Sequence, residues 1–268
     1  SRTETDSYYV NALDNLTNPI AYDIIRVNSS ADAPEIGILS EYQMIIWVCG
    51  TDYQSGDTDV TFTDNDKSNV AEYLEDGGAM WVVGMDILYD FDTSDGDRSA
   101  GDFEHDYLGV SYADNDRATP AVVYGVDDDP ISDGVEYNAD AISSDFADDI
   151  NPRSGFEKVL SSNGDYNIST IRTEDEFKLV FMTIDFSSIT SSDDRDEFME
   201  NIVEYLVEQL ENDVSLSRFN TPKDEETVEP NVENIVNVTV RNRGTEDQDS
   251  IQVSLEITCL NNSYTFTD

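Results

Sequence analysis

The side chains that could perform nucleophilic chemistry are few in this chain. It contains two cysteines, Cys49 and Cys259, and a single histidine, His105. Cys49 ends an apolar run, and a thiol at the carboxyl end of a strand lies where open α/β sheets bind ligands. A cysteine nucleophile also needs a base, and His105 is the only imidazole available. Because His105 stands among acids in FEHDYLG, we favour a surface histidine paired with carboxylates over a Cys49–His105 dyad.

Acidic residues between positions 90 and 102 form the best candidate metal site in the sequence. Calcium binds about six to eight oxygen atoms, supplied by closely spaced carboxylates and carbonyls. The segment DFDTSDGDRSAGD has that chemistry, although its first glycine is misplaced for an EF-hand loop. A solvated acidic loop is the interpretation that we favour, and calcium is the alternative. The calcium ligands would come from Asp90, Asp92, Asp95, Asp97 and Asp102.

The net charge is the strongest feature of the composition. The 268 residues include 59 acidic and 14 basic side chains, which gives a formal net charge of -45. Such a field repels nucleic acid and anionic membranes, so we expect neither as a partner. General adaptation to salt is the favoured explanation, because the acids are spread along the whole chain. Specific calcium sites and an acidic patch for one basic partner are the alternatives.

Cysteines and glycosylation motifs give weaker indications about the environment of the protein. Cys49 and Cys259 fall in different predicted domains, so we favour two buried thiols over an interdomain disulfide. One histidine and the lack of a CxxC pair argue against a zinc site. No apolar run is long enough for insertion into a membrane. N-x-S/T motifs, which give weak support for secretion, occur at Asn15, Asn28, Asn167, Asn237 and Asn261.

Apolar runs and helical patterns alternate through the first part of the chain. Residues 43–49 and 79–83 are almost continuously apolar, as in central parallel strands that are covered on both faces. Between them, Thr63 is a good cap for a helix that Gly77 and Gly78 end. This β-α-β order is the crossover that parallel strands require. Further strands are predicted at 21–27, 121–126, 168–172 and 177–184, and helices at 5–18 and 192–211.

The pattern changes after residue 212. Three segments alternate with period two, at 214–216, 235–240 and 251–257. This is antiparallel sandwich patterning, but an immunoglobulin-like sandwich has about seven strands. We therefore predict an α/β domain over residues 1–212 and a partial β module over 213–268. Because a doubly wound sheet usually opens with a strand, we also expect a further strand upstream of the first helix.

Four blocks of the sequence resemble parts of known families. YLEDGGAMWVVGMDI, together with FKLVFMTIDFSSI and the following DRDEFMENIVEYL, resembles the class I glutamine-amidotransferase-like, flavodoxin-like domain of large secreted bacterial and archaeal proteins. That resemblance covers residues 5–211. The stretch VTVRNRGTEDQ resembles the CARDB type of immunoglobulin-like surface module. Together they imply a three-layer α/β sandwich with a mostly parallel, doubly wound sheet, followed by a partial antiparallel β-sandwich.

The same resemblance implies that the α/β domain is catalytically inactive. Active members of the family place a nucleophilic cysteine in a G-x-C-x-G turn, and Met85 stands at that position here. A thioether cannot serve as the nucleophile. The family's catalytic histidine would follow the strand that ends near Asp185, and residues 186–189 contain none.

These observations favour a structural role over an enzymatic one. We expect a structural or adhesive segment of an extracellular, multidomain surface protein, such as a surface-layer or filament component of an archaeon. Its partners would be other surface-protein domains or further copies of itself. The alternative is an accessory domain of a secreted hydrolase whose catalytic domain lies outside this chain. No cofactor other than calcium is expected.

Overall fold

The computed structural model divides into two compact units, Ser1–Val207 and Glu208–Asp268. The division falls after residue 207, whereas the sequence predicts a boundary after residue 212. The structure describes residues 2–28, 31–50, 61–92, 95–117, 121–139, 147–162, 166–173, 177–207, 214–221, 237–242, 254–259 and 262–267.

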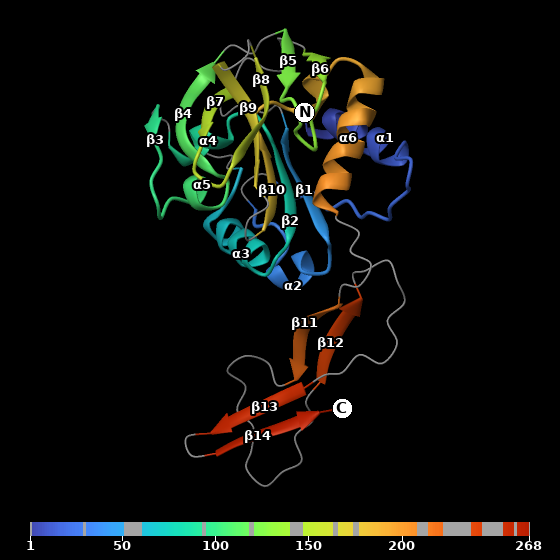
Figure 1. The fold of residues 1–268 in the computed structure, drawn as a ribbon, viewed down its shortest axis with the longest axis vertical. Helices are drawn as coiled ribbons and strands as arrows, with labels where there is room; N and C mark the ends of the chain where they lie inside the picture. The colour runs from blue at the N-terminus through green and yellow to red at the C-terminus, as the bar shows by residue number, and fades with distance from the viewer. Residues whose placement is uncertain are drawn as a thin grey trace. The chain divides into compact units, whose positions relative to one another are not determined.

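A seven-stranded mixed sheet forms the centre of the first unit (Figure 1). Its strand order is β1-β2-β10-β9-β8-β5-β6. The strands are β1 (Met44–Gly50), β2 (Ala79–Gly84), β10 (Lys178–Met182), β9 (Tyr166–Thr173), β8 (Glu157–Ser162), β5 (Val122–Gly125) and β6 (Glu136–Asn138). Strands β1, β2 and β10 are parallel, and each later neighbour in the order is antiparallel.

The predicted mostly parallel sheet is therefore wrong, although the α/β class holds. Parallel neighbours need a crossover of about a dozen residues or more, which the helix between β1 and β2 provides. Strand β9 follows β8 after a short connection and precedes β10 after another, so these neighbours pair as antiparallel hairpins. The sequence predicted strands at 168–172 and 177–184, which correspond to β9 and β10, but it did not predict β8. The direction of these strands follows from their short connections.

Helices cover both faces of the sheet and form a layer on each side. Trp81 and Val83 of β2 belong to one core cluster, and Met80 and Val82 belong to the other, as expected for alternating strand side chains. The first cluster includes side chains of α1 (Arg2–Asp14) and α6 (Ser192–Leu206). The second includes side chains of α2 (Ile36–Leu39), α3 (Asp64–Glu75), α4 (Ile87–Phe91) and α5 (Phe103–Asp106).

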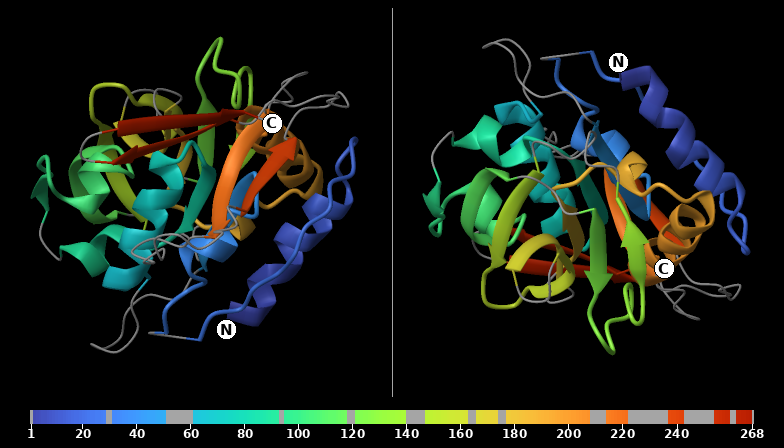
Figure 2. Two further views of the ribbon diagram at one scale, coloured as in Figure 1. Left: turned by 90° about the horizontal axis from the view of Figure 1, so that it is seen from below. Right: turned by 90° about the horizontal axis from the view of Figure 1, so that it is seen from above.

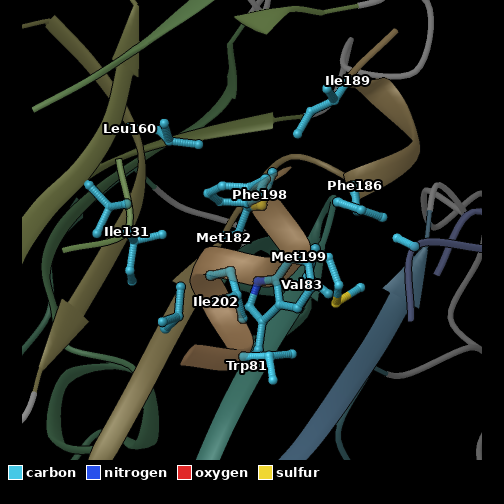
Figure 3. Packing of buried hydrophobic residues seen from close by; sticks show 14 of the residues in the cluster. Trp81, Val83, Ile131, Leu160, Met182, Phe186, Ile189, Phe198, Met199 and Ile202 are labelled. Carbon is cyan, nitrogen blue, oxygen red and sulfur yellow. The ribbon is translucent and has the colours of Figure 1, made fainter. Parts of the chain in front are cut away.

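The core between the sheet and α6 is built around Trp81, which is fully buried (Figure 3). Its ring meets Phe186 edge-on at a centroid distance of 5.4 Å and Phe198 at 6.0 Å. Tyr9 of α1 packs on the same group, 5.9 Å from Trp81 and 4.9 Å from Phe186. Side chains from α1, β2 and α6 therefore share one aromatic cluster.

Helix capping agrees with the sequence prediction. Thr63 caps α3 and accepts a hydrogen bond from the Asp66 amide, while the Asp66 side chain accepts from the Thr63 amide. This reciprocal pair is a capping box with aspartate in place of the usual glutamate. Ser191 caps α6 by a single hydrogen bond, which its hydroxyl accepts from the Asp194 amide. Both helix starts follow from local side-chain chemistry.

One short sheet and one unexpected irregular segment are the remaining features of the first unit. Strands β3 (Gly96–Asp97), β4 (Val110–Arg117) and β7 (Ala147–Pro152) form a three-stranded antiparallel sheet. The segment 21–27, predicted to be a strand, is irregular and largely exposed. Strand β1, predicted to be central, instead ends the described strand order. None of the helices that the structure describes is long and apolar enough to cross a membrane.

The second unit contains two hairpin-like pairs. Strand β11 (Val214–Thr221) pairs with β12 (Asn237–Asn242), and β13 (Ser254–Cys259) pairs with β14 (Asn262–Thr267), both antiparallel. Among the described residues these pairs form separate two-stranded sheets. The antiparallel character agrees with the prediction, whereas the partial sandwich is not confirmed.

Candidate functional site

The carboxyl ends of the three parallel strands meet at one edge of the sheet, where open α/β folds bind their ligands. Cys49 is the second-last residue of β1, Asp86 lies two residues after β2, and Asp185 lies three residues after β10. These side chains are almost completely inaccessible: Cys49 is 7% exposed, Asp86 4% and Asp185 0%. We call these three residues and Met85 the carboxyl-edge cluster.

Two glycines bring the ends of β1 and β2 into close contact. A Cβ atom on Gly84 would lie 2.6 Å from Cys49 Cβ and 3.0 Å from the Gly50 nitrogen. The Met85 amide donates to the Gly50 carbonyl at 3.0 Å. Only glycine fits at position 84, because any side chain there would push β1 away from β2. The backbones thus fill the space beside Cys49.

The turn after β2 differs from the turn that the sequence resemblance implies. Met85 is buried, as 2% of its surface is exposed, and its thioether packs inside the unit. The left-handed residue of this strand-to-helix turn is Asp86, with φ 59° and ψ 12°, which occupies the N-cap position of α4 without a side-chain capping hydrogen bond. Aspartate tolerates this conformation better than most residues. No pattern in the sequence singled out Asp86.

Asp185 is a buried carboxylate held by local hydrogen bonds. Its Oδ1 accepts from the Ser187 amide at 2.8 Å, and its Oδ2 accepts from the Tyr9 hydroxyl at 3.4 Å. Burial raises the pKa of Asp185 above the usual value, and the hydrogen bonds from Ser187 and Tyr9 oppose that shift. Burial is also the main cause of the raised pKa of Tyr9, followed by the charge of Asp185. Helix α1 therefore closes this end of β10.

The raised pKa of Asp185 predicts that this carboxylate destabilises the fold once it ionises. The folded state holds the proton more tightly than the unfolded state, so this contribution to stability is present at low pH and is lost as the pH rises through the folded pKa. The variant Asp185→Asn should gain stability relative to the natural chain as the pH rises through that window. Urea unfolding at several pH values measures the difference.

A matched control separates this effect from the loss of one negative charge. Asp127 lies on an exposed turn, so Asp127→Asn removes a charge without touching a buried group. A stability difference for Asp185→Asn that stays constant with pH would contradict the prediction.

His105 is paired with the carboxylate that follows it in the chain. It lies on α5, where its Nδ1 is 2.7 Å from Asp106 Oδ1, and its carbonyl accepts from Arg153 Nε at 2.8 Å. The hydrogen bond to His105 lowers the pKa of Asp106. The favoured interpretation, a histidine paired with a carboxylate, matches this geometry.

The five aspartates of the predicted calcium site take separate local roles. Asp90 accepts from the Thr61 amide at 2.8 Å, Asp102 accepts from the Ser99 amide at 2.8 Å, and Asp92 lies 3.8 Å from Arg98. Asp95 and Asp97 are exposed, and Asp97 lies in β3. Within the described ranges, no three acidic, cysteine or histidine side chains form a group that could hold a metal ion. Calcium binding by this segment stays a prediction.

Asp129 has a structural role that the sequence did not reveal. Its Oδ1 accepts from the amides of Ile131 and Ser132, at 2.9 and 3.1 Å, and from the Ser132 hydroxyl at 3.2 Å. Its Oδ2 accepts a hydrogen bond from Arg172 Nε at 2.7 Å. Arg172 lies in β9, forty-three positions away, so only the fold brings this pair together.

The glycosylation motifs lie in different surroundings. Asn15 is exposed and its amide donates to Asp196 at 2.8 Å, while Asn28 is exposed in the irregular segment. Asn167 lies in β9, and the serine of its motif, Ser169, is 5% exposed. Asn237 begins β12, and Asn261 falls outside the described residues. Modification of all five stays a prediction.

A shallow polar groove of about 360 Å³ lies where α1 meets the start of α6. The Arg195 guanidinium stacks over the Tyr8 ring at 4.6 Å on this side of the unit. The sequence did not indicate this groove, because its two sides are about 180 positions apart in the chain. Its lining residues are Tyr8, Asn11, Asp14, Asn15, Ser192, Arg195 and Asp196.

Comparison with known proteins gives only distant likenesses. No protein-family model matches the chain, and no curated protein matches it. Among solved structures, a ThuA-like protein from Bacteroides uniformis is 14% identical with a TM-score of 0.48, covering 76% of this chain and 83% of that one. A ThuA-like protein from Parabacteroides merdae is 11% identical with a TM-score of 0.45, covering 91% and 94%. The β-galactosidase from Rahnella sp. R3 is 13% identical with a TM-score of 0.48, covering 97% and 35%.

These findings correct the family resemblance drawn from the sequence. With no family model matching, the assignment to a glutamine-amidotransferase-like domain followed by a CARDB-type module is wrong as stated. The structures named above are ThuA-like proteins and a β-galactosidase, not CARDB or immunoglobulin-like modules. With TM-scores below 0.5 and identities below 15%, these likenesses assign neither a family nor a function to this chain.

Proposed function

We propose that this chain is a non-catalytic structural or adhesive segment of an extracellular, multidomain surface protein. The observation that carries the proposal is the burial of the carboxyl-edge cluster. An enzyme of this architecture exposes its reactive groups at that edge. Here Met85 fills the turn after β2, and Tyr9 of α1 covers Asp185.

The charge of the chain supports the proposal that this protein works in an environment rich in salt. A formal net charge of -45 makes copies of the chain repel one another strongly at low ionic strength. Salt shortens the range of this repulsion to about 3 Å at molar concentration. A segment that works beside copies of itself, or beside other acidic surface domains, can therefore assemble only when its charges are screened.

Assembly of the purified chain tests this proposal. Light scattering during titration with NaCl, from millimolar to molar concentration, should detect reversible self-association that grows with salt. Sedimentation with isolated cell envelopes, in the same buffers, measures adhesion. A chain that stays monomeric at every salt concentration and never sediments with envelopes would contradict the proposal.

The same titration separates calcium from general salt adaptation. Thermal stability should rise steadily into molar NaCl, because screening reduces self-repulsion within the folded state. Micromolar CaCl₂ at constant ionic strength is the control. A rise in melting temperature with micromolar calcium would favour specific sites, since only tight binding stabilises a fold at that concentration.

A further inference from the structure

Residues 20–27 form an exposed segment that belongs to no sheet of the first unit. The segment reads IAYDIIRV, and its β-branched composition favours a strand, yet it adopts neither helix, strand nor turn. No backbone–backbone hydrogen bond joins it to another residue that the structure describes. Ile24 and Ile25 are 48% and 51% exposed. Within the described part of the chain, this strand-forming sequence therefore has no strand beside it.

Side chains hold this segment against α1. The Tyr22 hydroxyl donates to Asp14 at 2.8 Å, near the end of the helix. Arg26 forms an ion pair with Asp6 at 2.9 Å, nearer the start of the helix. The chain therefore runs back along α1, as Figure 2 shows. These contacts fix the position of the segment although its backbone joins no sheet.

The segment is an electrically neutral part of a strongly acidic chain. Residues 15–28 contain one acid and one base, Asp23 and Arg26, whereas the whole chain has 59 acidic and 14 basic residues. Two copies of the chain repel one another through their net charge. A contact made by this segment in both copies adds no net charge at the contact itself, and it buries Ile24 and Ile25 of each copy.

The order of residues in the segment suits antiparallel pairing with itself. A two-fold axis between positions 24 and 25 brings opposite charges and apolar side chains face to face. Opposed side chains of antiparallel strands lie on the same face, where apolar and opposite-charge pairs stabilise the pairing. The opposed pairs, each formed twice, are Ile24 with Ile25, Asp23 with Arg26, and Tyr22 with Val27.

The charges of the segment keep the capacity for a second partner. Asp23 accepts a hydrogen bond from the Tyr42 hydroxyl at 2.9 Å through Oδ2, and Arg26 contacts Asp6 through Nε and one terminal nitrogen. A carboxylate has a second oxygen, and a guanidinium has a further nitrogen that donates. The contacts within one copy therefore do not exclude an Asp23–Arg26 pair between copies.

We propose that residues 20–27 pair as an antiparallel strand with the same segment of a second copy of this chain. This inference rests on the self-association proposed above and assigns a surface to it. Pro19, which has no backbone N–H, limits the strand at one end. Because the same patch serves both copies, the contact closes as a dimer. Salt favours this dimer by screening the repulsion between the other parts of the two copies.

Exchange of the two charges tests the register. Asp23→Arg places like charges opposite each other twice in the dimer, and it should weaken dimerisation about tenfold or more. The same change makes the chain less acidic, so a general effect of net charge would strengthen dimerisation instead. Asp23→Arg combined with Arg26→Asp restores opposite charges, and this double variant should dimerise like the natural chain. Sedimentation velocity measures each dissociation constant at the lowest NaCl concentration at which the natural chain dimerises, since molar salt screens these pairs.

A second variant tests the apolar part of the contact and leaves both charges in place. Ile24→Ser with Ile25→Ser should also weaken dimerisation about tenfold or more, because four exposed side chains lose their apolar contact in each dimer. Both residues are exposed, so the melting temperature of the monomer should change little. The matched control is Tyr124→Ser, which alters an apolar side chain that is 38% exposed on β5 and should leave dimerisation unchanged.

The outcomes separate this inference from the proposed function. If the natural chain dimerises and the Asp23→Arg and serine variants dimerise as tightly, the surface is wrong and self-association stands. A charge-exchanged double variant as weak as Asp23→Arg would overturn the antiparallel register. A natural chain that stays monomeric at every NaCl concentration would overturn the inference as well, and its sedimentation with cell envelopes would then decide whether the adhesive role survives.

Discussion

Replacing Asp129 by alanine is expected to lower the free energy of unfolding of the first unit by about 3–5 kcal/mol. The Asp129 side chain is 3% exposed and that of its partner Arg172 is 11% exposed, so water has little access to the ion pair. Removing the carboxylate leaves a buried guanidinium without its counter-charge. It also removes the acceptor for the amides of Ile131 and Ser132. For a domain of this size, the loss corresponds to roughly 6–20 °C in melting temperature.

Two further variants distinguish the pair from the turn that Asp129 holds. The double variant Asp129→Ala with Arg172→Met removes both charges, and replacing a whole buried pair by apolar groups usually costs little. It should recover part of the lost stability, with the remainder reporting the lost contacts to residues 131 and 132. Asp127→Ala, on the exposed part of the same turn, is the control and should change the melting temperature little.

Urea unfolding, monitored by fluorescence, measures the free energy of unfolding of the natural chain and of the three variants. The outcome that would contradict the argument is an Asp129→Ala variant that unfolds at the same urea concentration as the Asp127→Ala control. Such a result would mean that water replaces the carboxylate without loss of stability.

Replacing Trp81 by alanine is expected to cost about 3–5 kcal/mol as well. The side chain is fully buried between Phe186 and Phe198, and its removal opens a cavity under α6 (Figure 3). Because the indole nitrogen is buried with no hydrogen-bond partner among the described residues, the ring contributes through packing rather than through a polar contact. Trp81→Phe should therefore cost less, below about 2 kcal/mol.

Trp47 is the matched control for this substitution. It lies on the edge strand β1, half-buried, and stacks on Phe62 at 4.7 Å. Trp47→Ala should destabilise the unit less than Trp81→Ala, because a half-buried ring loses less surface and leaves no closed cavity. Equal unfolding midpoints for the two variants would show that burial of Trp81 is not what stabilises the core.

Local sequence patterns predicted the longer helices and the two apolar strands β1 and β2, but not the short helices α2 and α4 or the strand β8. The capping residue Thr63 and the following apolar spacing predicted α3, and the apolar face of residues 198–206 predicted α6. Continuous apolar runs predicted β1 and β2 within one or two residues. These features depend on contacts within a few residues, so composition and periodicity are sufficient to predict them.

Tertiary structure decided which of these elements lie side by side, and therefore what the candidate site contains. The sequence identified Cys49, His105 and Met85 as the residues relevant to catalysis, but only the fold showed that Asp185 and Tyr9 close that edge. It likewise paired Asp129 with Arg172 and placed the apolar strand β1 at the end of the described strand order. Such arrangements depend on contacts between distant positions and on strand direction, which periodicity within a segment does not encode.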